Sequence, residues 1–206
     1  MFRYAGPMGG SRKDVRVRLQ RAALELYAER GYGRTTAADI AALAGVTERT
    51  YFRHFPDKRE VLFDGDAEFR AALAAAVLAA PAEMPPLPAL LQAFRSAAPM
   101  FERDRAAQEF RHRIVASTPE LQERDQMKVA LLTDALTEAL ERRATPPGPA
   151  WLAAACGTAV LTRARTQWLA GSPRDYPTLL ADAFGELGVL VADAADQQTW
   201  PAPAVS

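Results

Sequence analysis

The stretch TTAADIAALAGVTERTYFRHFPDKREVL, residues 35–62, decides how the chain is expected to fold. Thr36 lies three residues before Asp39, a spacing at which the hydroxyl and the carboxylate each accept a hydrogen bond from a free backbone N–H at the start of a helix. Gly45 follows the apolar positions of that helix, and glycine commonly ends helices because it adopts positive φ at little steric cost. Thr47 can then cap the next helix. The pattern predicts two short helices joined by a tight turn.

The second of these helices has two different faces. Tyr51 and Phe55 share one face with Val46, which favours burial of that side. The opposite face is polar and carries Glu48, Arg49, Phe52 and Arg53. A helix of seven or eight residues with an arginine-bearing outer face is typical of the second helix of a helix-turn-helix.

The rest of the chain favours an all-α fold of about nine helices. Hydrophobic residues make up 49% of the 206 residues, many of them alanine, a strong helix former, and no segment alternates with period two for long. We expect a three-helix helix-turn-helix domain at 11–58 and a larger helical domain at 59–196. Residues 1–10 and 197–206 are expected to be disordered tails.

Capping pairs and prolines suggest where the other helices begin and end. Ser11 with Asp14 opens the first helix, and Asp57 with Glu60 opens a fourth that should continue to about Ala80. PAEMPPLP at 81–88 is the clearest break. Further helices are expected near 87–98, 100–117, 119–143, 149–170 and 174–195, with Pro99, Pro119, Pro149 and Pro173 in first turns.

Charge and cysteine content limit the compartment and the partners. Residues 1–60 carry 12 Lys/Arg and 7 Asp/Glu, whereas the chain as a whole has no net charge, so the first part is the one suited to a polyanion. Cys156 is the only cysteine, which favours a reducing compartment. We find no signal peptide and no apolar run of membrane-spanning length, so we expect a cytoplasmic protein without a membrane partner.

Several motifs at fixed spacing resemble the DNA-binding domain of the TetR family of bacterial transcriptional regulators over about residues 12–63. They are Gly31-Tyr32, Thr35-Thr36, Ile40-Ala41, Ala44-Gly45-Val46, and Phe52-Arg53-His54-Phe55-Pro56 with Lys58. The resemblance implies a homodimer that binds palindromic operator DNA, usually as a repressor, and a C-terminal domain that holds a small inducer. RHRIVASTPELQERD and the later TRARTQW segment resemble mycofactocin-type members, a subgroup associated with acyl-CoA-like ligands.

This resemblance suggests a role for each polar residue of the helix-turn-helix. Arg49 suits a bidentate contact with guanine, Arg53 a base or a phosphate, and Phe52 a thymine methyl group. Glu48 can accept from cytosine or orient a neighbouring arginine. Candidates for phosphate contacts are Thr36, Thr47, Thr50, His54 and Lys58. For His54 the alternative is a helix-end residue bonded to a nearby carbonyl.

The larger domain is expected to bind the effector and to dimerise. Arg111 suits a phosphate or carboxylate, although a surface salt bridge is the alternative. The last two long helices, rich in alanine and glycine, are expected to pair with a second subunit, or else to be buried in the monomer. Apolar candidates for a ligand cavity, or simply for core, are Phe94, Met100, Phe101, Phe110, Met127, Trp151 and Trp168.

Two functions of other classes compete with a ligand-responsive regulator. A helical-bundle enzyme is disfavoured because the chain has only two histidines and no Gly-rich phosphate loop. A nonspecific DNA-packaging protein is disfavoured by the modest charge of the N-terminal part. We therefore expect no catalytic residues, no metal site and no cofactor.

Overall fold

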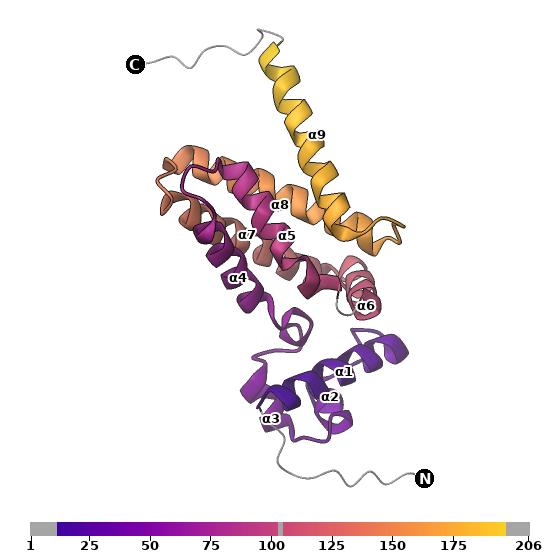
Figure 1. Cartoon of the computed structure of the whole chain (residues 1–206). Helices are drawn as coiled ribbons and strands as arrows, with labels where there is room; N and C mark the ends of the chain where they lie inside the picture. The colour runs from indigo at the N-terminus through magenta and orange to yellow at the C-terminus, as the bar shows by residue number, and fades with distance from the viewer. Residues whose placement is uncertain (1–11, 103–104, 197–206) are drawn as a thin grey trace. The chain divides into compact units, whose positions relative to one another are not determined.

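The computed structural model describes residues 12–102 and 105–196, and the regular structure there is entirely helical (Figure 1). The elements are α1 (Arg12–Arg30), α2 (Ala37–Leu43), α3 (Glu48–His54), a 3₁₀ turn η1 (Glu60–Phe63), α4 (Asp66–Ala79), α5 (Pro86–Glu102), α6 (Arg105–Ala116), α7 (Pro119–Glu141), α8 (Pro147–Leu169) and α9 (Tyr176–Asp196). The all-α prediction with nine helices is confirmed for this part of the chain. Both predicted tails, and Ser11 as a cap, lie outside it.

The chain forms two compact units, each with its own core. The first takes in the residues up to Asp66 together with 110–125, and the second takes in 67–109 and the residues from 126 onward. Helices α6 and α7 therefore contribute residues to both units. The sequence analysis instead divides the chain by expected function, with a DNA-binding domain that ends at residue 58, and this division stays a prediction.

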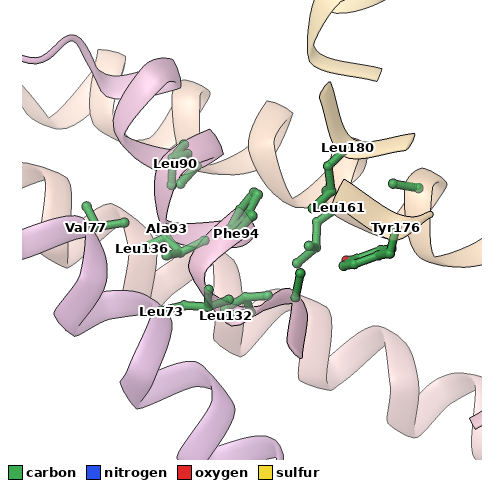
Figure 2. Close-up of a cluster of buried hydrophobic side chains, with 14 of the residues drawn as sticks. Leu73, Val77, Leu90, Ala93, Phe94, Leu132, Leu136, Leu161, Tyr176 and Leu180 are labelled. Carbon is green, nitrogen blue, oxygen red and sulfur yellow. The ribbon is translucent and has the colours of Figure 1, made fainter. Parts of the chain in front are cut away.

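Each core is built from the helix faces on which apolar residues recur at helical spacing. In the first unit, Leu19, Ile40, Tyr51 and Phe55 are buried with Leu121 from α7. In the second unit, Figure 2 shows side chains of α4, α5, α7, α8 and α9 meeting in one cluster. Its labelled members are Leu73, Val77, Leu90, Ala93, Phe94, Leu132, Leu136, Leu161, Tyr176 and Leu180.

Three predicted helix boundaries are wrong. The expected fourth helix is interrupted after η1, because Gly65 has a φ of 89° that ends the helical path before α4 begins. Helix α5 runs through Pro99 to Glu102, because the buried Ala97 and Ala98 keep this turn packed although proline removes one hydrogen bond. Helix α9 begins at Tyr176 rather than near Pro173.

None of the described helices combines the length and the apolar content that crossing a membrane requires.

Candidate functional site

Helix α2 starts at the predicted capping box. The Thr36 hydroxyl oxygen accepts a hydrogen bond from the Asp39 N–H at 3.1 Å, and the Asp39 carboxylate accepts one from the Thr36 N–H at 2.9 Å. The Thr36 hydroxyl also donates to the Asp39 carboxylate at 2.7 Å, and this bond, together with the one from the Thr36 N–H, holds the pKa of Asp39 below its usual range although the side chain is on the surface. After α2, Gly45 adopts a φ of 67°, so the tight turn into α3 requires the conformation that glycine favours.

Helix α3 is fixed by the capping residue that precedes it and by its inner face. The Thr47 hydroxyl oxygen accepts a hydrogen bond from the Thr50 N–H at 3.2 Å and so caps the helix. Tyr51 and Phe55 are buried, with ring centroids 5.7 Å apart. The Tyr51 hydroxyl also donates to the Asp57 carbonyl at 3.3 Å. A helix of only seven residues is held in one orientation by these contacts.

The outer face of α3 is exposed as predicted from the sequence. It carries Glu48, Arg49, Phe52 and Arg53, and the Phe52 side chain is 48% exposed although it is aromatic. Among the residues described, Glu48, Arg49 and Arg53 have no ion-pair partner. Two free guanidinium groups one turn apart on a short, rigid helix can reach acceptors outside the molecule.

His54, at the end of α3, faces inward rather than outward. The residue is only 7% exposed, and its Nδ1 atom has no hydrogen-bond partner in the described part of the chain. Burial, together with Arg53, Arg12 and Arg16, lowers the pKa of His54, so the ring is held neutral. A phosphate contact by His54 would require the ring to leave this position; that role stays a prediction.

The three threonines and Lys58 already have partners inside the first unit. The Thr36 hydroxyl is hydrogen-bonded at the start of α2. The Thr47 and Thr50 hydroxyl oxygens lie 3.0 Å apart, within hydrogen-bond distance, at the start of α3. Lys58 Nζ donates to the Tyr32 carbonyl at 2.8 Å and lies 3.9 Å from the centroid of the Tyr32 ring. Burial lowers the pKa of Lys58. Any phosphate contact by these groups would be added to an internal role.

Arginines fasten the segment 110–125 to η1, a feature that the sequence analysis missed. Arg111 donates to the Leu62 carbonyl at 2.8 Å and lies 4.0 Å from the Asp66 carboxylate. Arg124 forms an ion pair with Glu60 at 2.5 Å. The two hydrogen-bonded pairs are 49 and 64 residues apart in the sequence, so no local pattern indicates the contacts. Arg111, predicted to bind a ligand, therefore holds η1 within the first unit.

The predicted ligand residues do not form one site. Phe110 packs against the core of the first unit, whereas Phe94 and Trp168 belong to the core of the second. Met127 and Trp151 are 54% and 56% exposed, and Met100 is also exposed. Phe101 packs against this second core, where the Tyr176 ring contacts both Phe101 and Trp168. Tyr176 was not among the residues predicted from the sequence, and its position in the chain gives no signal of this role.

Two families of known proteins match this chain. "Bacterial regulatory proteins, tetR family" matches residues 19–64, and "MftR C-terminal domain" matches residues 84–191. The second match covers just over half of the chain, and the first includes α3 with its exposed arginines.

Individual relatives agree with these matches. The HTH-type transcriptional regulator TcmR of Streptomyces glaucescens is 42% identical over 93 residues, which span 44% of this chain and 41% of TcmR. Among solved structures, Thermus thermophilus FadR, a TetR-family transcriptional repressor in complex with lauroyl-CoA, is 25% identical with a TM-score of 0.52. The similarity covers 93% of this chain and 99% of FadR. A TetR-family regulator from Syntrophomonas wolfei, 18% identical over 88% of this chain and 97% of its own, has a TM-score of 0.60 and supports the fold alone.

Proposed function

This chain belongs to the TetR family of bacterial regulatory proteins, and from that premise we propose that it regulates transcription as a homodimer bound to palindromic operator DNA. We propose repression that a small apolar or acyl-CoA-like effector relieves. The observation that carries the DNA-binding part is the exposed outer face of α3, where Arg49 and Arg53 have no partner among the described residues.

The major groove of B-DNA admits an α-helix and presents a distinct pattern of acceptors and donors for each base pair. Arg49, in the first turn of α3, is proposed to pair with guanine O6 and N7. Arg53, one turn later, reaches a base or a phosphate, and Phe52 packs on a thymine methyl group. Glu48 accepts from a cytosine amino group or orients Arg49.

Phosphate contacts are proposed for residues around this helix. Thr36 and Thr47 lie at the N-termini of α2 and α3, where free backbone N–H groups favour an anion. Thr50 and Lys58 complete this set in addition to their internal contacts, and His54 joins it only when its ring leaves the buried position.

The second subunit is proposed to cover the C-terminal part of α9 together with the start of α8. The first half of α9 is buried through Tyr176, Leu180 and Ala183, but Val189, Leu190 and Val191 are 59%, 67% and 59% exposed. Trp151 and Leu152 on α8 are also exposed apolar side chains. Such apolar groups are costly to leave in water and are typical of subunit interfaces.

Part of α8 serves the monomer instead. A Cβ added at Gly157 would lie 2.9 Å from Leu90 Cδ1, so this small residue allows α8 to pack closely on α5. The small residues of α8 therefore divide between the core and the proposed interface.

The effector is proposed to be an acyl-CoA-like molecule, supported by the similarity to FadR, whose crystal structure contains lauroyl-CoA. By linkage, such an effector releases DNA only if it binds the conformation that cannot span both half-sites more tightly than the one that can.

Gel-shift titration with an excess of unrelated competitor DNA tests this function. A duplex enriched from a random pool should stay bound when a hundredfold mass of random duplex is added, and lauroyl-CoA should release it. Equal competition by both DNAs would instead indicate nonspecific binding.

A further inference from the structure

Four aromatic rings from four helices meet in the second unit. Tyr176 of α9 lies 5.4 Å from Phe101 of α5 and 5.7 Å from Trp168 of α8, measured between ring centroids. Phe101 in turn lies 4.6 Å from Phe69 of α4 in an edge-to-face arrangement. We call these four residues the ring cluster. It is apolar except for the Tyr176 hydroxyl and the Trp168 indole N–H.

The Tyr176 hydroxyl is a buried donor that has no hydrogen-bond partner among the described residues. The residue is 0% exposed, and Figure 2 shows its oxygen directed away from α9. The other buried tyrosines differ, because the hydroxyl of Tyr27 donates to the Lys58 carbonyl at 3.1 Å and that of Tyr51 to the Asp57 carbonyl. An unmade hydrogen bond in a core is costly, so this exception calls for a function.

The hydroxyl is a donor at physiological pH, and its surroundings suit an apolar molecule. Burial raises the pKa of Tyr176, while the nearby positive charge of Arg165 acts in the opposite direction. The phenol is therefore neutral and keeps its proton. Phe69 and Phe101 are only half-buried, so the cluster reaches solvent on the side of α4 and α5.

We propose that the Tyr176 hydroxyl donates a hydrogen bond to the acyl oxygen of the effector, whose chain packs against Phe69, Phe101 and Trp168. This inference rests on the acyl effector class proposed above and names the group that would recognise it. The shared chemistry is an acyl oxygen on an apolar chain, which either a thioester or a free carboxylate supplies. A site with a buried donor rejects analogues that lack the acceptor, because the donor then stays unpaired.

The test compares three probes of equal chain length on the full chain and on Tyr176→Phe, which removes only the hydroxyl. Lauroyl-CoA and laurate carry the acyl oxygen, whereas S-dodecyl-CoA keeps the nucleotide and the chain without it. By isothermal titration calorimetry, the unchanged protein should bind lauroyl-CoA about tenfold more tightly than S-dodecyl-CoA if the acceptor is a thioester, or should bind laurate about tenfold more tightly than Tyr176→Phe does if the acceptor is a carboxylate. In Tyr176→Phe any preference for lauroyl-CoA should vanish while the affinity for S-dodecyl-CoA stays the same. Which of the two acyl probes loses affinity in Tyr176→Phe identifies the source.

Thermal unfolding of the ligand-free proteins provides the matched control. Tyr27→Phe should lower the midpoint, because it removes a hydroxyl that is already bonded, whereas Tyr176→Phe should leave the midpoint unchanged or raise it. A decrease as large as that of Tyr27→Phe would show that Tyr176 has a partner within the protein and would overturn the proposal. Unchanged affinity for both acyl probes in Tyr176→Phe would also overturn it. If the unchanged protein binds operator DNA but none of the three probes, the acyl effector class itself is wrong and this inference falls with it, while DNA regulation stands.

Discussion

Helix α3 and the last turns of α9 both leave side chains uncovered, but the uncovered groups are opposite in kind. On α3 they are charged, with Arg49 and Arg53 free of ion pairs within the described structure. On α9 they are aliphatic, with Val189, Leu190 and Val191 all more than half exposed. A charged surface can stay in water and attract a polyanion, whereas an apolar one gains free energy only when another surface covers it. The comparison teaches that one chain carries two uncovered surfaces whose chemistry suits two different kinds of partner.

The two surfaces also differ in how they are held. Helix α3 has seven residues, and its orientation depends on the Thr47 cap and on two buried rings, Tyr51 and Phe55. Helix α9 has 21 residues, and those of its described side chains that are fully buried lie in its first half. We therefore expect substitutions on α3 to act on DNA contacts directly, and substitutions at the end of α9 to act through assembly.

The largest effect is expected when the apolar surface is broken. Leu190→Asp places a charge in the proposed interface, so sedimentation should show a monomer. Operator affinity should fall by at least about 100-fold, because two linked half-site contacts become independent. Met127→Asp is the matched control, because Met127 on α7 is also an exposed apolar residue, at 54% against 67% for Leu190. A dimer that survives Leu190→Asp would place the interface elsewhere.

The charged surface should be sensitive to one side chain in particular. Arg49→Ala removes the proposed guanine contact and should cost about 1–3 kcal/mol in binding free energy on the selected operator, relaxing the preference at one position per half-site. Fluorescence anisotropy with the parent and single-base variant duplexes measures both. Arg95→Ala, an exposed arginine of the second unit, should change neither. Unchanged affinity in Arg49→Ala would remove this residue from base recognition.

Lys58 tests whether an internally bonded charge also contributes to DNA binding. Lys58→Ala should weaken binding to all sequences alike and reduce the slope of log affinity against log salt concentration by about 1. The measurement is anisotropy from low to moderate salt. An unchanged slope with a lower melting temperature would show that Lys58 stabilises the fold through its contacts with Tyr32 and does not bind DNA.

The smallest effect is expected for a substitution of His54, which lies on the buried side of α3. Because burial and neighbouring arginines lower the pKa of His54 in the folded protein, the unfolded chain binds this proton more readily. The stability contributed by the neutral ring is complete above about pH 6.5 and is lost as the pH falls through the lowered folded value. His54→Gln should therefore lessen the decrease in unfolding free energy between pH 7.5 and pH 5, measured by urea denaturation. His112→Gln is the control, and equal decreases in both variants would contradict the interpretation.

The sequence predicted local features well because they depend on neighbours along the chain. The capping box of Thr36 and Asp39, the turn at Gly45 and the two faces of α3 follow from spacings of three or four residues. The continuation through Pro99 was missed, since packing of the buried Ala97 and Ala98 keeps that turn helical. The interruption at Gly65 was missed although glycine is a local signal for such a break. The contacts of Arg111 and Arg124 with η1 were beyond any local pattern, because the partners are far apart in the sequence.

The effector residues were harder to predict than the DNA-binding face. Aromatic residues on helices pack in cores whether or not a ligand is bound, so Phe94, Trp168 and Trp151 look alike in the sequence although only the first two are buried. Tyr176 is distinguished by its unmet hydrogen bond, and that becomes visible only when every neighbouring donor and acceptor has a position.

Methylation interference on the selected operator tests most directly whether α3 reads the major groove twice. Guanine N7 methylation should block binding at two symmetric clusters about 10 base pairs apart, or a multiple of that spacing, as expected for a dimer on a palindrome. With Arg49→Ala, one guanine in each cluster should no longer interfere. A single cluster, or interference confined to adenine N3 in the minor groove, would contradict the account.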